Sequence, residues 1–321
     1  MQTEFTRALG IQAPIIGGAM YPCSNPELVA AVSRAGGIGI IQPLSLTYVH
    51  GYDFRAGIRY MRHLTDRPLG VNLIIEASSR KYLRRVHEWL DIALEEGIGF
   101  FITALGNPRW VVERAKPAGA LVYHDATNRR WADKALAGGV DGFICVNDRA
   151  GGHVGELPPE QLFEQLAPLG RPLICAGGIG SPADFRAALA MGYAGVQLGT
   201  RLIAARECNA HADYKAAIIA ATESDITLSE KISGVPVSVI RTPYIDAMGT
   251  RAGPLARWML RHPRTKHWMR TLYSLQSLWR LKRSALGGSD YRDYYQAGRS
   301  VGGIHTEQTV AEIIAEFTAS G

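Results

Sequence analysis

The sequence predicts an α/β fold: a closed (β/α)8 TIM barrel with a basic, helical insertion after the eighth strand. Short apolar runs recur along the chain, and each is followed by a polar turn and a helical pattern, which is typical of β-α units around a parallel sheet. The runs are almost continuously hydrophobic, as expected for strands that are covered on both faces. The first run is not followed by a Rossmann G-x-G-x-x-G motif, which favours a closed barrel over an open doubly wound sheet.

Eight of these runs are candidate strands: residues 13–17, 38–41, 69–74, 99–103, 121–124, 142–146, 172–176 and 195–198. The helices between them begin and end at recognisable residues. Asn25 and Ser181 precede prolines, which predicts an N-cap before a proline at the first helical position. The glycines that follow helical stretches as C-caps would are Gly36, Gly97, Gly138 and Gly192.

The pattern changes after the eighth strand. Residues 207–221 predict a helix, 229–251 an extended and loop-like segment, 255–286 a basic and aromatic helical segment, and 310–318 a short amphipathic terminal helix. A barrel of this kind commonly takes about 250 residues, so the 321 residues suit one barrel with an extra segment. We therefore assign residues 1–228 and 301–321 to the barrel, and 229–300 to an insertion or lid subdomain.

The composition is that of a globular protein, with 47% hydrophobic and 20% charged residues. No apolar stretch approaches the ~18 residues that a membrane span requires. The first ten residues include an acid and lack an apolar core, so we expect no signal peptide and a cytoplasmic location.

The cysteines indicate neither a metal site nor a disulfide framework. Cys23, Cys145, Cys175 and Cys208 lie far apart in the sequence, and none forms a C-x-x-C pair. Cys145 and Cys175 end apolar runs and are expected to be inert residues of the core. We therefore expect no bound metal.

The positive charge is concentrated in one segment. The net charge is +6, but residues 248–289 contain nine Lys or Arg and no acid, so the rest of the chain carries −3. Trp258, Trp268, Tyr273 and Trp279 lie among these charges, a composition found in membrane-surface helices and nucleic-acid grooves. The simpler interpretation, a solvated lid whose aromatic residues pack on the barrel, is preferred. Nucleic acid is not expected because the remaining surface is acidic.

The loops after the last two strands predict a phosphate site. In (β/α)8 barrels these loops commonly bind phosphate with backbone N–H groups. Strand seven leads into Gly177 and Gly178, and strand eight into Gly199 and Thr200. Glycine allows the backbone to approach an anion closely, and a following helix adds the positive end of its dipole.

Polar residues in two other loops indicate a ligand at the same end of the barrel. Asn72 ends an apolar strand, where its amide needs either a ligand edge or its own backbone as partner. The loop after strand six contains Gly151, Gly152 and His153, and the glycines would present the imidazole without neighbouring bulk. With an ordinary pKa near ~6.5, a histidine can take or give a proton at neutral pH.

Five ordered motifs, spanning about residues 10–210, resemble the nitronate monooxygenase (formerly 2-nitropropane dioxygenase) family of FMN-dependent TIM-barrel enzymes. They are PIIGGAM at 14–20, AGGIG at 35–39, GVNL at 70–73, AGGHVG at 150–155 and GVQLGTR at 195–201.

The resemblance implies a flavin site and a catalytic residue. Gly18, Ala19, Met20 and Asn72 would contact FMN, Gly151 and Gly152 would line it, and Gly177, Gly178, Gly199 and Thr200 would hold its phosphate. His153 matches the catalytic histidine, which removes the α-proton of a nitroalkane or lies beside the bound nitronate. His124 falls where relatives often carry a lysine near the isoalloxazine, a change that would alter the flavin potential.

Two activities remain open on these motifs. The first is oxidation of alkyl nitronates or nitroalkanes by dioxygen, which yields a carbonyl compound and nitrite. The alternative is an NAD(P)H-dependent FMN reductase of quinones or enoyl thioesters, because such enzymes share the barrel and the Gly-Gly-His loop. The basic insertion suits an acyl-carrier protein, a nucleotide phosphate or a membrane surface.

Overall fold

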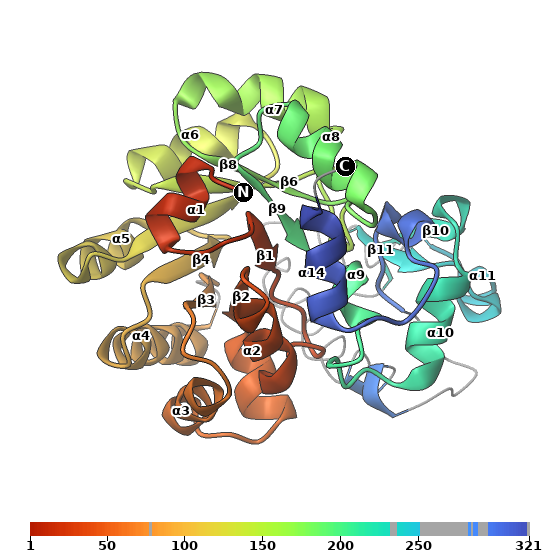
Figure 1. Ribbon diagram of the computed structural model, residues 1–321, viewed down its shortest axis with the longest axis horizontal. Coiled ribbons are helices and arrows are strands. Elements are labelled where there is room, and N and C mark those ends of the chain that lie inside the picture. The colour runs from red at the N-terminus through yellow and green to blue at the C-terminus, as the bar shows by residue number, and fades with distance from the viewer. Residues whose placement is uncertain (77–78, 232–235, 251–281, 284, 288–294, 320–321) are drawn as a thin grey trace.

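Eight parallel strands close into a barrel in the computed structural model, which describes residues 1–76, 79–231, 236–250, 282–283, 285–287 and 295–319 (Figure 1). Pairing of β9 with β1, in the register Ile16 to Gln197, completes the ring. The barrel strands are β1 (Ile15–Gly17), β2 (Ile38–Ile41), β3 (Leu69–Ile74), β4 (Phe100–Ala104), β5 (Leu121–Ala126), β6 (Gly142–Val146), β8 (Leu173–Ala176) and β9 (Gly195–Leu198). The predicted fold class and all eight predicted strands are confirmed.

Helices cover the outside of the barrel. They are α2 (Pro26–Arg34), α3 (Phe54–Leu64), α4 (Arg80–Glu95), α5 (Arg109–Ala115), α6 (Arg129–Ala137), α7 (Pro159–Leu166) and α8 (Pro182–Ala190). The C-terminal helix α14 (Val310–Thr318) packs against both α2 and α8, and so completes the outer layer beside β1 and β9. Phe317 of α14 contacts Phe185 of α8, with ring centroids 5.9 Å apart. The predicted terminal helix is confirmed.

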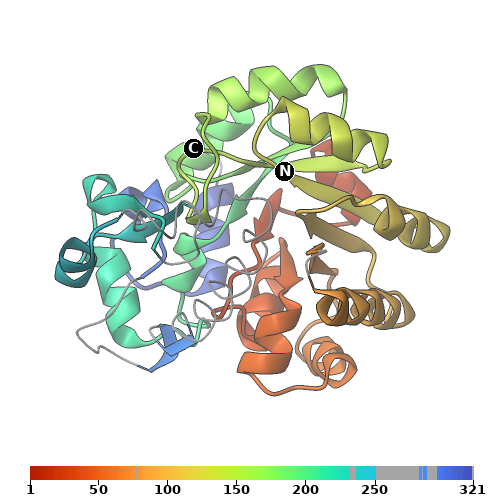
Figure 2. The ribbon, with the colours of Figure 1, turned by 180° about the vertical axis from the view of Figure 1, so that it is seen from behind.

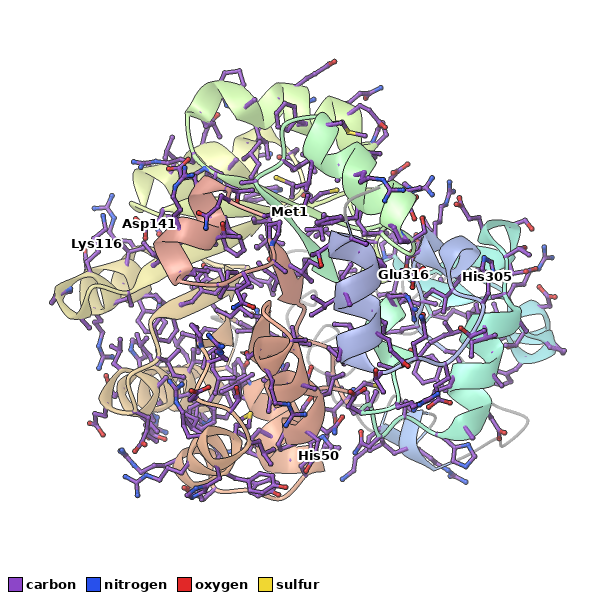
Figure 3. The ribbon with its side chains drawn as sticks, in the orientation of Figure 1. Met1, His50, Lys116, Asp141, His305 and Glu316 are labelled. Carbon is purple, nitrogen blue, oxygen red and sulfur yellow. The ribbon has the colours of Figure 1, made fainter. Side chains whose placement is uncertain are left out.

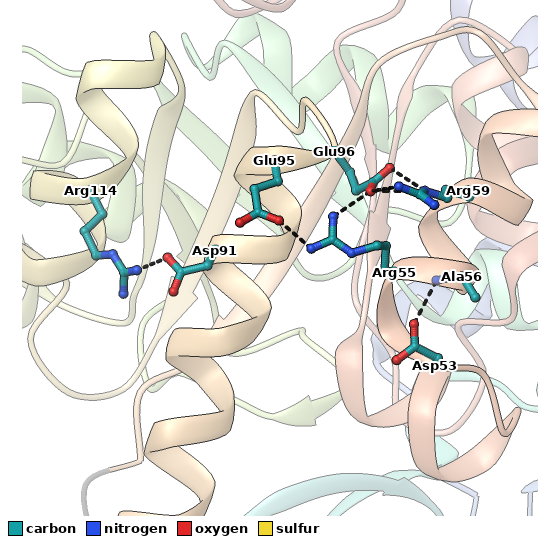
Figure 4. Close-up of polar contacts among 8 residues, drawn as sticks. All are labelled: Asp53, Arg55, Ala56, Arg59, Asp91, Glu95, Glu96 and Arg114. Atoms are coloured by element: carbon teal, nitrogen blue, oxygen red, sulfur yellow. Dashed lines mark hydrogen bonds and ion pairs between the residues drawn. The ribbon is translucent and has the colours of Figure 1, made fainter.

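Ion pairs join neighbouring outer helices (Figure 4). Arg55 and Arg59 of α3 both contact Glu96 at the end of α4, each at 2.8 Å. Arg114 of α5 pairs with Asp91 of α4. Exposed pairs of this kind contribute only about 0–1 kcal/mol each, so burial of apolar side chains holds the outer layer on the barrel.

The N-terminal helix α1 (Glu4–Leu9) closes the floor of the barrel. Its Phe5 is fully buried, and its ring centroid lies 5.9 Å from that of Phe100 and 5.8 Å from that of Tyr123. Figure 1 shows α1 in front of the strands, and Figure 2, from behind, shows it beyond them; Met1 lies beside it in Figure 3. The open end is therefore the mouth, formed by the carboxyl ends of the strands.

One helix cap differs from the sequence predictions. Ser181 caps α8 in a capping box with Asp184, as predicted, but the Asn25 side chain makes no capping bond to α2. Its buried amide instead donates to the Glu207 carbonyl at 2.9 Å. Gly138 is the C-cap of α6, as predicted, and the left-handed conformation follows at Gly139 (φ 88°).

A second, antiparallel sheet forms beside the barrel. It contains β10 (Ile226–Ser229), β11 (Val237–Ile240) and β7 (Gly152–His153), and β7 belongs to the loop after β6. β11 and α11 (Pro243–Met248) lie within the segment that was predicted as loop-like, and α10 (Ala212–Ala220) lies within the helix predicted at 207–221. Figures 1 and 2 show β10, β11, α10 and α11 together at one side of the barrel.

The basic segment predicted at 255–286 lies almost entirely outside the described residues. Its described end reaches the barrel, since Lys282 Nζ donates to the carbonyl of Tyr48 at 3.2 Å. Tyr48 belongs to η1 (Ser45–Val49), a π-helical turn after β2. The division into barrel and lid remains a prediction.

Short helical turns complete the described secondary structure: η2 (Lys116–Ala118), η3 (Ala167–Leu169), α9 (Thr200–Ile203), η4 (Glu223–Asp225) and η5 (Arg299–Gly303). No helix among the described residues is long and apolar enough to cross a membrane.

The contact between β2 and α2 gives a test of the packing. A Cβ on Gly39 would lie 2.0 Å from the backbone oxygen of Val29, which cannot move without shifting α2. We expect Gly39→Ala to lower the free energy of unfolding by about 3 kcal/mol, at the upper end of overpacking costs. Gly99→Ala is the matched control, since nothing lies within 4 Å of its Cβ position. Equal denaturant midpoints for the two variants would contradict the described packing.

Candidate active site

The glycines after β8 are required by the fold of the mouth. Gly177 and Gly178 have φ of 125° and 80°, which side-chain-bearing residues rarely adopt. A Cβ on Gly177 would lie 2.2 Å from Asn147 Oδ1, and one on Gly178 would lie 2.4 Å from Arg149 Nε. The loop after β8 therefore packs tightly against the loop after β6.

The loops after β6 and β9 meet at a third segment, which returns from the end of the chain. Thr200 Oγ1 accepts a hydrogen bond from the backbone N–H of Gly298 at 3.0 Å. A Cβ on Gly151 would lie 2.9 Å from that same nitrogen and 3.1 Å from Thr200 Oγ1. The structure thus brings together Gly151 and Thr200, and places Gly298 of the C-terminal segment beside them.

The loop after β1 lies beside the loop after β9. Met20 Sδ would be 3.8 Å from a Cβ on Gly199, and the backbone N–H of Met20 donates to Ser24 Oγ at 2.8 Å. Ala19 packs against the interior cluster of the barrel. Gly18 faces the side chain of Gln197, whose Cγ would be 3.0 Å from a Cβ at position 18.

Polar side chains of β3 and β9 point into the barrel. Asn72 pairs in register with Ile102, and Gln197 pairs with Ile16 and Ala176; these three apolar partners belong to the interior cluster. Asn72 is 8% exposed, and its Nδ2 donates to the Ile102 carbonyl over a long 3.4 Å. Gln197 Oε1 is buried without a hydrogen-bond partner among the described residues. Both amides therefore have unused bonding capacity that faces the mouth.

Two adjacent residues of β5 point to opposite sides of the strand. His124 lies on the face of Val122 and Ala126, which pack in the outer core, and its Nδ1 lies 2.8 Å from Thr103 Oγ1. Burial lowers the pKa of His124 to about 4, so the ring is neutral at physiological pH. The structure therefore does not turn the His124 ring toward the interior, and its predicted place beside a flavin remains untested.

Asp125 takes the inward face of β5 instead. Its register partner is Ile144, a member of the interior cluster. Asp125 Oδ1 is buried and has no hydrogen-bond partner among the described residues, and burial raises the pKa of this carboxyl to about 7. Asp125 is not among the predicted site residues, because the strand was predicted to end at His124.

His153 lies in β7, opposite Val237 of β11, in the loop that begins with the left-handed Gly152 (φ 68°). The His153 side chain is exposed to solvent, although the protein around the ring lowers its pKa through desolvation. The imidazole is therefore neutral at pH 7, the form that can accept a proton. A cavity of about 320 Å³ adjoins this loop and is lined by residues that include Asp148, Val154, Ser238 and Arg299.

The floor, the open mouth and the ring of loops define a (β/α)8-barrel enzyme, a class in which catalytic groups lie at the carboxyl ends of the strands. The sequence profile of the nitronate monooxygenase family matches residues 2–320. The chain belongs to that family and is an oxidoreductase.

Individual relatives differ in their activities. A nitronate monooxygenase of Pseudomonas aeruginosa is 31% identical over 316 residues, which cover 83% of this chain and 88% of the relative. A (3aS,4S,5R,7aS)-5-hydroxy-7a-methyl-1-oxo-octahydro-1H-indene-4-carboxyl-CoA dehydrogenase of Rhodococcus jostii is 29% identical over 249 residues, 77% of this chain and 68% of the relative. The family thus includes relatives named for different substrates.

Solved structures share the whole architecture. FabK from Thermotoga maritima has a TM-score of 0.80 and 28% identity, with 99% of this chain and 95% of that chain covered. A nitroalkane oxidase from Streptomyces ansochromogenes has a TM-score of 0.78 and 23% identity, with 98% and 97% covered, and supports the fold alone.

The buried carboxyl of Asp125 makes stability depend on pH. Its pKa is near 3.8 when unfolded and about 7 when folded, so the unfolded chain releases this proton first as the pH rises. Stability is therefore lost between about pH 4 and pH 7, and the loss is complete above the folded pKa. At pH 8 the free energy of unfolding of Asp125→Asn should exceed that of the unsubstituted protein by about 2 kcal/mol. This is roughly half of what the pKa change implies, because the residue is partly exposed. The gain, measured by urea denaturation, should vanish near pH 4.

Asp66→Asn is the control for this comparison, since the Asp66 side chain is 96% exposed. A gain of equal size for both variants, or one that does not change with pH, would contradict the burial of an unpaired carboxyl at position 125.

Proposed function

We propose that the chain is an FMN-dependent nitronate monooxygenase, which oxidises alkyl nitronates or nitroalkanes with dioxygen to a carbonyl compound and nitrite. The observation that carries the proposal is the close packing of the loop of His153 on the glycine loops after β8 and β9. Gly151 lies against Thr200, and Gly177 lies against Asn147. The match to the family over nearly the whole chain and the 31% identity to a nitronate monooxygenase support the proposal.

The residues at the mouth fit FMN. The phosphate would be held by the loops after β8 and β9, at Gly177, Gly178, Gly199 and Thr200. Backbone N–H groups can approach an anion at these glycines. The Thr200 hydroxyl accepts a hydrogen bond from Gly298, so its own hydrogen remains free to donate to the phosphate. The buried, underused amides of Asn72 and Gln197 suit the polar edge of a flavin ring. Bound FMN would supply the electron-accepting chemistry that no amino-acid side chain provides.

His153 has two tasks in this proposal. With a nitroalkane, the neutral imidazole takes the α-proton onto a ring nitrogen and leaves the nitronate anion. With a nitronate, no carbon-bound proton needs to leave, and the imidazole N–H donates a hydrogen bond that orients the anion. The surrounding loops hold the substrate in place and limit its motion.

Substitution of His153 tests this assignment. We expect His153→Asn to bind FMN within about 2-fold of the unsubstituted affinity but to release nitrite from a nitroalkane about 100-fold more slowly, the usual loss for a general base. His305→Asn is the matched control, since His305 is exposed at the surface (Figure 3). Unchanged nitrite release by His153→Asn would remove this residue from the mechanism, and no nitrite from any short alkyl nitronate would refute the activity.

A second candidate function is oxidoreduction of an acyl thioester, with NAD(P)H as electron donor for a reductase that acts on enoyl thioesters or quinones. It is favoured by the similarity to carboxyl-CoA dehydrogenases at 29% and 28% identity. Nine positive charges between residues 248 and 289 would complement the phosphates of coenzyme A, of a nucleotide or of an acyl-carrier protein. In both functions, we propose that residues 229–300 act as a lid whose basic surface meets the substrate or a membrane surface.

A further inference from the structure

The carboxyl of Asp125 has a defined position relative to the floor and mouth of the barrel. Two residues earlier on β5, the Tyr123 ring contacts Phe5 of the floor helix. Since side chains alternate along a strand, Asp125 occupies the next inward position toward the mouth. Its register partner Ile144 lies on the same interior face.

In the part of the chain that the structure describes, neighbouring groups leave Asp125 Oδ1 without a hydrogen-bond partner. The potential partners on its own strand and on β4 are His124 and Thr103, but they bond to each other on the outer face. On β6, burial raises the pKa of the Cys145 thiol, and the charges of Cys175 and Asp125 add to the rise. Burial is the cause of the raised pKa of Asp125, and no described cation opposes it.

An unpaired carboxyl in this position is costly unless a ligand meets it. Removing an ionised carboxylate from water without a partner is strongly unfavourable, so the group keeps its proton instead. A protonated carboxyl has one O–H to donate. Asn72 and Gln197 point inward from β3 and β9, so Asp125 belongs to the polar lining of the mouth.

We propose that Asp125 is a catalytic residue which, in its protonated form, donates a hydrogen bond to an acceptor atom on the ring of the bound flavin. The inference rests on the proposed flavin site and adds a residue that neither the sequence motifs nor the resemblance assigns. When the carboxyl ionises, the donor is lost and the negative charge repels the carbonyl oxygens of the ring. Flavin affinity therefore falls as the pH rises.

Titration of the flavin-free protein with FMN, followed by flavin fluorescence, tests the proposal without turnover. We expect the unsubstituted protein to lose about 10-fold in affinity between about pH 6 and pH 8.5, because each pH unit above the pKa costs up to tenfold. Asp125→Asn keeps a donor that cannot ionise, so the part of the pH dependence of FMN affinity that comes from Asp125 should disappear. Asp125→Leu lacks the donor and should bind about 5-fold more weakly at low pH, the effect of one hydrogen bond.

Asp66→Asn is the matched control, since the Asp66 side chain is 96% exposed. It should titrate like the unsubstituted protein, and circular dichroism checks that each variant is folded. Ionisation of the FMN phosphate is common to all variants and cancels in the comparison.

The results of these titrations separate the role of Asp125 from the existence of the flavin site. Equal pH dependence in the unsubstituted protein and Asp125→Asn would overturn the role of Asp125 and leave the flavin site intact. Loss of the pH dependence in Asp66→Asn as well would show that the dependence does not come from position 125. Failure of the unsubstituted protein to bind FMN at any pH would overturn both the inference and the proposed function.

Discussion

Pairing of β9 with β1 is the interaction on which the rest of the structure depends. It closes the sheet, so that eight carboxyl ends form one ring and the side chains of each strand face either the interior or the helices. A side chain reaches the mouth only if it faces the interior of the barrel and lies near the carboxyl end of its strand. Asn72, Asp125 and Gln197 satisfy both conditions, whereas His124 fails the first.

The mouth is built from loops that are far apart in the sequence. The loops after β6, β8 and β9 hold one another through contacts that leave no room for a Cβ, at Gly151, Gly177 and Gly178. The C-terminal segment also takes part, because Gly298 donates to Thr200 and a Cβ on Gly180 would lie 2.0 Å from the Ser300 carbonyl. Packing of α14 between α2 and α8 ties the end of the chain to the barrel, and the site depends on it.

Hydrophobic pattern was sufficient to predict the strands, because covered strands are continuously apolar and turns interrupt them. The same criterion placed the end of β5 at His124, where the apolar run stops, whereas backbone pairing continues to Ala126. The sequence pattern therefore did not show that Asp125 belongs to β5 and that its side chain faces the interior. Gln197 could have been found by the argument applied to Asn72, a polar residue in a core strand. The segment that contains Gly298 resembles the family's closing segment, but no local pattern names Thr200 as its partner, because that contact spans 98 positions.

The chemistry at this mouth is tested most directly by anaerobic mixing of the flavin-loaded protein with a possible electron donor. An alkyl nitronate, NADH and NADPH are each mixed in a separate experiment, and the flavin absorbance is recorded over time. A nitronate monooxygenase should show a rapid change in the flavin spectrum with the nitronate and none on that timescale with either nicotinamide. Rapid bleaching by NADH or NADPH, without a response to the nitronate, would contradict the proposed function and assign the barrel to the reductases.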